Sequence, residues 1–332
     1  MNIINHKSKK AFTMMELIFV IVIMGILAKF GVEFLTTAYS GFINSKINNK
    51  LQQNSASALE FVAARLQYRI KASTIAREPA GDDSFTPISL YFGQTANILE
   101  WIGYDIEGYR GGVSGTWSGV LDLNNTETNG NQLSSIDTNT TNINNIISAL
   151  SNGNSGMSSG VNSSAAIYFV NPDALEINAS YWGWDMNPAV SMPLFNTQSD
   201  VYIHPVKAAA DTSLFIPINA NGVVNTFTGV DAYEFYQLAW SAYAVGIDNY
   251  DEYDAATNPD GTNTGDLTLW YNYQPWRGED RNDGNSSVIM QNVSSFQFIA
   301  RESIIKIQVC VKSILLIDEG EEYSICKEKT IF

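Results

Sequence analysis

The 332-residue sequence has little of what catalytic and metal sites are commonly built from. It contains two cysteines and two histidines, and none of them shows the ligand spacing of a zinc site. His204 precedes Pro205 with no serine or cysteine motif beside it. We therefore expect a protein that is not an enzyme, with no catalytic residues and no required cofactor. Paired carboxylates for glycoside hydrolysis are the catalytic alternative, because a sequence does not show which acids converge.

Phosphate-binding loops are missing as well. A nucleotide site of the P-loop kind needs Gly-Lys-Ser/Thr, and a dinucleotide site needs its glycines between a strand and a helix. The glycines of residues 101–117 alternate with aromatic residues and meet neither requirement. Turns between strands explain them better.

Basic residues are scarce. The chain has 19 Lys and Arg against 34 Asp and Glu, a formal net charge of −15. Between Arg110 and Arg277 the only basic residue is Lys207. Such a surface repels a phosphate backbone, so we do not expect direct binding to nucleic acid. An acidic exterior can serve solubility alone; divalent cations or basic partners are the alternatives.

Charge is also sparse in one long apolar segment near the start. The sequence from Lys9 to Ala28 is KKAFTMMELIFVIVIMGILA, and the apolar segment, residues 12–35, spans about 36 Å as a helix. That exceeds the roughly 30 Å of a bilayer core. The aliphatic and Phe residues of 17–28 contribute about −4 kcal/mol to insertion, enough for one acid that costs about 3 kcal/mol. Hydropathy therefore permits Glu16 but gives no reason for it, while Lys29 and Glu33 lie one turn apart and can pair.

The flanks of this segment predict its orientation. Lys7, Lys9 and Lys10 precede it with no acid among them, so the positive-inside rule keeps them cytoplasmic and places the rest of the chain outside. A secretory signal is cut after its apolar run at small residues, and no convincing Ala-x-Ala site follows here. A simple one-pass anchor is the plain alternative.

The motif KKAFTMMELIFVIVIMGILA resembles the amino terminus of type IV prepilins and type II secretion pseudopilins. The resemblance implies that residues 1–11 are a leader, that prepilin peptidase cuts between Ala11 and Phe12, and that Phe12 is then methylated. Glu16 becomes the fifth residue, whose charge meets the amino terminus of a neighbouring subunit during assembly. The residue before the cut is usually Gly in this family, and here it is Ala11.

The resemblance further implies a minor pilin or minor pseudopilin, a structural subunit of a type IV pilus or a type II secretion pseudopilus. Its partners are then other pilin subunits, prepilin peptidase and inner-membrane lipid. We expect a single pass through the bacterial inner membrane with the carboxy-terminal domain in the periplasm. The size of the chain and a long polar insertion favour a low-copy or tip subunit. The alternatives are a pilus-borne adhesin that binds carbohydrate and a membrane-tethered protein that never polymerises.

The helix is predicted to continue past the membrane. Apolar and small residues recur every three or four positions from Leu51 to Ile70, which indicates an amphipathic helix that ends near Arg77, before Pro79. We expect a membrane half at residues 12–35, an amphipathic half at 36–78 and a globular domain at 79–332.

The globular domain is predicted to be an antiparallel sheet, which makes the fold class α+β and agrees with the helix-on-sheet shape of pilins. An Asn-, Ser- and Thr-rich insertion at about 123–164 is expected to be a long loop or disordered, with one or two helical turns at 143–150. Residues 231–245 are a helix candidate, with a strand as the alternative. The expected strands are 88–92, 98–104, 166–170, 287–290, 295–301, 304–317 and 323–331.

The two cysteines, Cys310 and Cys326, both lie in the last expected strands. If these strands form a hairpin, its midpoint is residue 318, inside the Asp318–Glu321 turn, and the cysteines face each other. A disulfide in the oxidising periplasm follows, and pilins often close this region with one. Two separately buried thiols are the alternative.

Acids and aromatics form the remaining candidate sites. Oxygen ligands on a Gly- and Asn-bearing loop suit calcium, although the EF-hand pattern fails and a solvated acidic loop explains the same residues. Two aromatic segments, 182–184 and 270–276, are explained either by a core or by stacking on sugars. The candidate calcium ligands are Asp248, Asp251, Asp254, Asp260 and Asp266.

Overall fold

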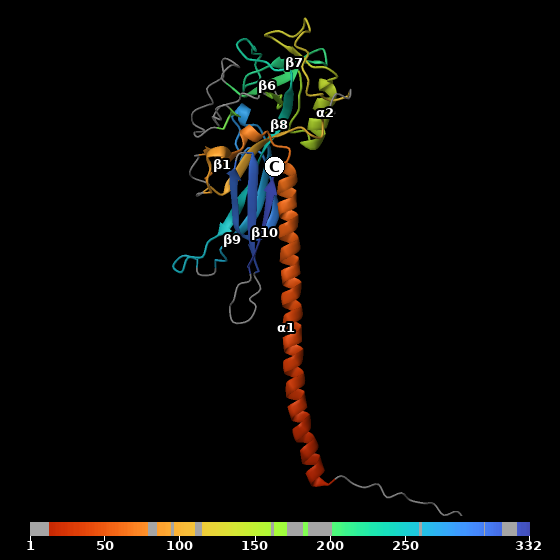
Figure 1. Ribbon diagram of the computed structural model, residues 1–332, viewed down its shortest axis with the longest axis vertical. Coiled ribbons are helices and arrows are strands. Elements are labelled where there is room, and N and C mark those ends of the chain that lie inside the picture. The colour runs from red at the N-terminus through yellow and green to blue at the C-terminus, as the bar shows by residue number, and fades with distance from the viewer. Residues whose placement is uncertain are drawn as a thin grey trace, which may run out of the picture.

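A long helix carries a globular head of antiparallel strands at its carboxy-terminal end, and about half of its length extends freely from the head (Figure 1). The computed structural model describes residues 13–78, 85–93, 96–109, 115–160, 163–170, 182–184, 201–258, 261–301, 303–313 and 324–332. The architecture is pilin-like and confirms the α+β fold class.

Helix α1 spans Met14–Leu66, 53 residues without a break. Its amphipathic half buries a stripe of small and apolar residues against the sheet: Ser55, Ala58, Leu59, Val62, Ala63 and Leu66. The predicted end near Arg77 is wrong. After Leu66 the chain turns through a short 3-10 helix, η1 (Lys71–Ser73), into strand β1 (Ile75–Arg77). Pairing of β1 with β3 (Ile98–Tyr104) outweighs helix propagation there, because it satisfies the same backbone groups and buries Ile75.

The sheet has 12 strands, and every described pair in it is antiparallel. Its main path is β12-β11-β10-β9-β8-β5-β6-β7-β4, and β3 joins β1 and β2 to the edge of β8. The remaining strands are β2 (Phe85–Pro87), β4 (Leu133–Ser134), β5 (Ala166–Phe169), β6 (Ile203–Ala208), β7 (Leu214–Pro217), β8 (Tyr236–Asp251), β9 (Thr264–Tyr273), β10 (Asn285–Arg301), β11 (Ile304–Lys312) and β12 (Ser324–Ile331).

Strand β10 joins two parts of the sheet. Residues 285–293 pair with β9, whereas residues 293–301 pair with β11. The change occurs beside Asn292, whose φ of 61° lies in the left-handed region that asparagine tolerates. We predicted two strands at 287–290 and 295–301; they are one bent strand, because its register shifts on both sides of Val293 without ending the pairing.

Several predicted strands are confirmed, including residues 98–104 as β3 and 166–170 as β5, which ends at Phe169. Residues 88–92 are not a strand. Ile88–Leu90 form a 3-10 helix, η2, because β2 ends at Pro87 and the Ile88 N–H instead bonds to the Thr74 carbonyl. Strand β11 ends at Lys312, and Asp318–Glu321 lie outside the described residues.

Contacts between distant parts of the chain decide the structure of two further segments. Residues 231–245, a helix candidate with a strand as the alternative, contain most of β8, a central strand that pairs with β3, β5 and β9, so the strand alternative is correct. The polar insertion at 123–164 is not the expected long loop, because it holds β4, helix α2 (Thr140–Leu150) and a part of the core, and α2 contains the helical turns expected at 143–150. Ile143 and Ile147 lie one turn apart on α2 and are fully buried against the strands, so the tract buries more than its composition suggests.

Candidate assembly surface on the amino-terminal helix

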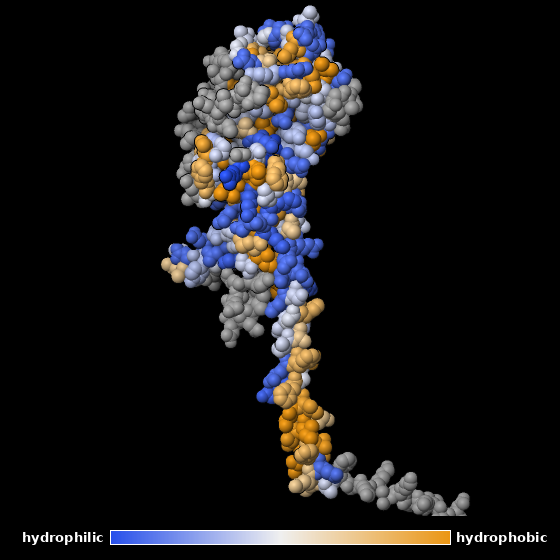
Figure 2. All heavy atoms as spheres, viewed as in Figure 1, coloured by the Kyte–Doolittle hydropathy of each residue, from blue (hydrophilic) through white to orange (hydrophobic). Residues whose placement is uncertain are grey.

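The first half of α1 is an apolar surface that no other described part of the chain covers. An 18-residue window of the helix has a mean hydropathy of 2.3, and none of that window is buried. Figure 2 shows this surface as a hydrophobic region at the end of the helix away from the head. Its length and composition are those of a membrane anchor or a signal sequence.

Glu16 lies at the start of this surface and closes a capping box. Its carboxylate accepts hydrogen bonds from the backbone N–H and the hydroxyl of Thr13, both at 3.0 Å, and Thr13 Oγ1 accepts the Glu16 N–H at 3.3 Å. Our sequence interpretation missed this role, although Thr-x-x-Glu before an apolar run is its local signal. Ala11 and Phe12, the residues of the expected cut, lie outside the described residues.

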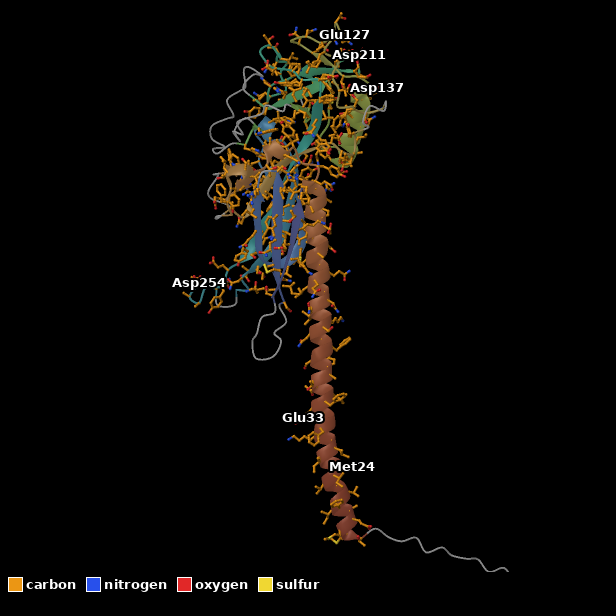
Figure 3. All side chains as sticks on the ribbon, in the orientation of Figure 1. Met24, Glu33, Glu127, Asp137, Asp211 and Asp254 are labelled. Atoms are coloured by element: carbon orange, nitrogen blue, oxygen red, sulfur yellow. A yellow bond between two sulfur atoms is a disulfide. The ribbon has the colours of Figure 1, made fainter. Side chains whose placement is uncertain are left out.

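The other two charges of the apolar half form the expected pair. Lys29 Nζ and Glu33 Oε1 lie 3.8 Å apart at one-turn spacing, and both side chains are exposed. Figure 3 shows Glu33 projecting from the helix between Met24 and the head. The apolar half therefore carries acids of two kinds, one held at the helix terminus and one paired with a lysine.

The second half of α1 anchors the head. It packs on β10, β11 and β12, and a cation–carboxylate contact joins Lys329 of β12 to Glu60 of α1. The expected disulfide is confirmed: Cys310 and Cys326 are bonded and stand opposite each other in the β11–β12 register. The bond ties the edge strand β12, which covers α1, to its neighbour in the sheet.

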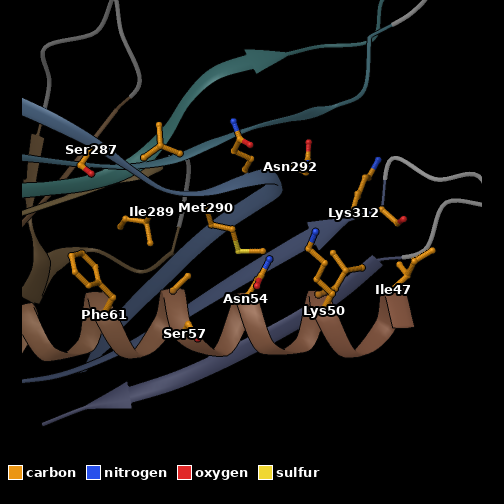
Figure 4. Close-up of a pocket in the computed structure, with 15 residues that line it drawn as sticks. Ile47, Lys50, Asn54, Ser57, Phe61, Ser287, Ile289, Met290, Asn292 and Lys312 are labelled. Atoms are coloured by element: carbon orange, nitrogen blue, oxygen red, sulfur yellow. The ribbon is translucent and has the colours of Figure 1, made fainter. Parts of the chain in front are cut away.

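A groove of about 1000 Å³ separates α1 from the first part of β10 (Figure 4). Phe61 and Lys50 line it from the helix, and Met290 and Asn292 line it from the strand. Lys50 and Lys312 are the charged side chains among its lining residues in the described part of the chain. The groove has both polar and apolar walls, and we assign it no ligand.

The acids predicted to bind calcium lie at the β8–β9 hairpin, which projects sideways from the head near Asp254 (Figure 3). The Asp251 carboxylate accepts from Asn258 Nδ2 at 2.7 Å and from the Thr262 N–H at 3.0 Å, and these bonds lower its pKa. Asp254 caps its own turn by accepting from the Ala256 N–H at 2.8 Å.

The structure brings only some of these acids together. Asp248 and Asp266 are register partners on β8 and β9, while Asp260 lies outside the described residues. Among the described residues, no group of three or more His, Cys, Asp or Glu side chains is placed to hold a metal ion. Because Asp260 is not described, calcium binding stays a prediction.

The aromatic segments and His204 belong to the core. Trp182, Trp184, Trp270 and Trp276 are all buried, which favours the core explanation over sugar stacking. Burial lowers the pKa of His204 to about 3, so this imidazole is neutral at physiological pH. Its ring lies 5.0 Å from that of Phe169.

No family model, curated protein or solved structure matches this chain in comparisons with known proteins.

Proposed function

We propose that the chain is a minor pilin or minor pseudopilin, a subunit that assembles into a type IV pilus or a type II secretion pseudopilus through α1. The observation that carries the proposal is the division of this one helix. Its apolar half is wholly exposed and begins with Glu16, and its other half is buried on an antiparallel sheet. A surface of this kind needs either lipid or copies of a similar helix around it, because water is unfavourable for so much apolar area.

A subunit that moves from the membrane into a filament meets these two surroundings in turn. In the membrane the apolar half of α1 is solvated by lipid tails, and in a filament it is solvated by neighbouring helices. Glu16 distinguishes the two states, since a carboxylate gains more from a positive partner than from lipid. The peptide sequence around Ala11-Phe12 supports cleavage by prepilin peptidase, which would create such a partner at the new amino terminus.

The size of the head favours a position of low copy number in the filament. It carries the β6–β7 and α2 additions beyond the strands that pack on α1, and these lie at the end of the head farthest from the helix start (Figure 1). Heads enlarged in this way would crowd one another if every subunit of a filament carried one. It suits a tip or another position of low copy number.

The amino terminus of the protein purified from its native membrane tests the proposal. Mass spectrometry should find a chain that begins at methylated Phe12. An intact Met1 would sink the proposal and leave a simple membrane anchor. A processed chain that is absent from sheared filaments, and from cross-links to other pilins, would favour a tethered protein that never polymerises.

A further inference from the structure

Six asparagines of this chain stand in Asn-X-Ser/Thr, the acceptor sequence of N-linked glycosylation in exported proteins. Four of the six also have an acid two positions before the asparagine. Acids make up 34 of the 332 residues, about one in ten, so chance places an acid at fewer than one of six such positions. The six are Asn124, Asn139, Asn162, Asn178, Asn285 and Asn292, and the four acids are Asp122, Asp137, Glu176 and Asp283.

The spacing has a physical meaning. In an extended peptide, side chains two residues apart point to the same side. An enzyme that binds such a peptide therefore meets the acid, the asparagine and the hydroxyl together on one face. A basic side chain of the enzyme can bind the carboxylate through charge-assisted hydrogen bonds.

The structure separates these asparagines by what their amides do. Asn139 is the N-cap of α2, and its Oδ1 accepts the N–H groups of Thr141 and Asn142 at 3.0 and 3.1 Å. Asn285 Oδ1 accepts from Asn272 Nδ2 at 2.9 Å. Both amides therefore hold part of the fold. Asn162 and Asn178 lie outside the described residues.

Asn124 differs from both. Its side chain is exposed, and in the described part of the chain its amide makes no hydrogen bond. Its own N–H donates to Asp122 Oδ1 at 3.2 Å, which places the acid beside the acceptor. Thr126, which supplies the hydroxyl two positions later, is also exposed. Asn124 and Thr126 are thus exposed together on a surface turn, with the half-buried Asp122 carboxylate beside them.

We propose that Asn124 is the site of an N-linked glycan, added on the periplasmic side of the membrane; the proposal rests on the export that the proposed function requires. The donor is a saccharide carried on a lipid diphosphate. Asn124 Nδ2 attacks the anomeric carbon and forms the new C–N bond as the bond from that carbon to the diphosphate oxygen breaks. The diphosphate leaves with the electron pair, and the amide loses one proton to solvent.

The position of the turn suits a modified filament subunit. Asn124 precedes Glu127, which Figure 3 places at the end of the head farthest from the start of α1. A glycan there extends away from the helix and from the α1–β12 contact. Glycosylation of Asn124 and assembly through α1 are therefore compatible on one molecule.

Peptide mapping by mass spectrometry of the full chain, purified from the cells that naturally make it, tests the proposal. We expect the peptide that contains Asn124 to be heavier than its sequence by one glycan. Asn124→Gln and Thr126→Ala should remove this mass, while Thr126→Ser should keep it. Asn131→Gln, an exposed neighbour without a hydroxyl residue two positions later, is the matched control and should keep it too.

A separate variant tests whether the charge of Asp122 promotes glycosylation of Asn124. Asp122→Asn keeps an oxygen that can accept the Asn124 N–H and removes the charge, so we expect a several-fold lower occupancy of Asn124. Unmodified Asn124 in the wild-type protein, or a glycan found only at another asparagine, would overturn the proposal. If Phe12 is methylated in the same sample while Asn124 is bare, this inference fails and the proposed function stands; an intact Met1 fails the proposed function itself.

Discussion

The Glu16 carboxylate and Thr13 form a reciprocal pair, in which Thr13 donates two hydrogen bonds of 3.0 Å to the acid and accepts one of 3.3 Å from its N–H. This pair satisfies backbone donors that the first turn of a helix otherwise leaves open. It also holds a negative charge at the helix end where the macrodipole favours one. Glu16 therefore has partners before any neighbouring subunit arrives, and assembly has to offer it a better one.

The first prediction separates capping from assembly. Glu16→Ala should leave membrane insertion intact and strongly reduce incorporation into filaments, because it removes the charge that a neighbouring amino terminus would meet. Thr13→Ala should cost about 1 kcal/mol at the helix terminus and leave incorporation largely unchanged. Immunoblots of sheared filaments and of membranes measure both quantities.

Glu33→Ala is the matched control, since it removes an acid from the same exposed half of α1 and frees only Lys29. We expect near-normal incorporation for this variant. Equal incorporation of the Glu16 and Glu33 variants would contradict the assembly role of Glu16 and leave capping as its function.

Local signals in the sequence predicted the parts of the fold that local interactions decide. The apolar spacing from Leu51 to Leu66 is a property of one helix, and the Cys310–Cys326 pairing depends on a hairpin of adjacent strands. The end of α1 depends instead on residues 75–77 meeting residues 98–100, and no local pattern records that pairing. The capping box was present in the sequence, but the same acid had a second explanation that concealed it.

Distant contacts decide the rest. Tyr236–Asp251 becomes a strand because β3, β5 and β9 all pair with it, and its aromatic run has no period that shows this. The polar composition of residues 123–164 predicted a loop or disorder, yet α2 packs Ile143 and Ile147 against strands far along the chain. Among the described residues the Asn124 amide makes no hydrogen bond, whereas the Asn285 amide accepts one, and only the structure could reveal the difference.

The disulfide gives the second prediction. Replacing both Cys310 and Cys326 by Ser should lower the free energy of unfolding by about 3 kcal/mol, the entropic value for a loop of roughly 15 residues. Denaturation of the full chain in detergent, followed by Trp fluorescence, measures the loss. The reduced wild-type protein should match the double variant. A loss below about 1 kcal/mol would mean that packing on α1 alone holds β12 in place.

A buried acid between two arginines gives the third prediction. Glu100 lies 3.2 Å from Arg77 Nε and 3.4 Å from Arg281 Nη1, and its side chain is 2% exposed. Glu100→Gln leaves two largely buried cations without their shared counter-charge, so we expect a loss of about 3–5 kcal/mol in unfolding free energy.

The exposed pair Lys306–Glu328, with its charged atoms 2.7 Å apart, is the matched control for that loss. Glu328→Gln should cost about 1 kcal/mol or less, because water screens this pair. Chemical denaturation at neutral pH compares the two variants. Similar losses at both sites would show that burial adds nothing to the role of Glu100.

The last prediction concerns acid. Burial lowers the pKa of His204 to about 3, whereas an unfolded histidine titrates near 6.5. Between these values the unfolded chain binds more protons than the folded one, so the stability that neutral His204 permits is present above about pH 6.5. It is lost as the pH falls, by about 1.4 kcal/mol per pH unit. His204→Phe, among Phe169 and Phe227, should remove this slope.

The comparison has to be made between variant and wild type at each pH, because burial also raises the pKa of Asp105. An acid with a raised pKa has the opposite sign: its contribution to stability falls as the pH rises above about 4. Urea denaturation at several pH values from about 4 to 7 therefore measures the difference, in which Asp105 cancels. A His204→Phe slope equal to that of the wild type would mean that His204 becomes protonated without unfolding the head.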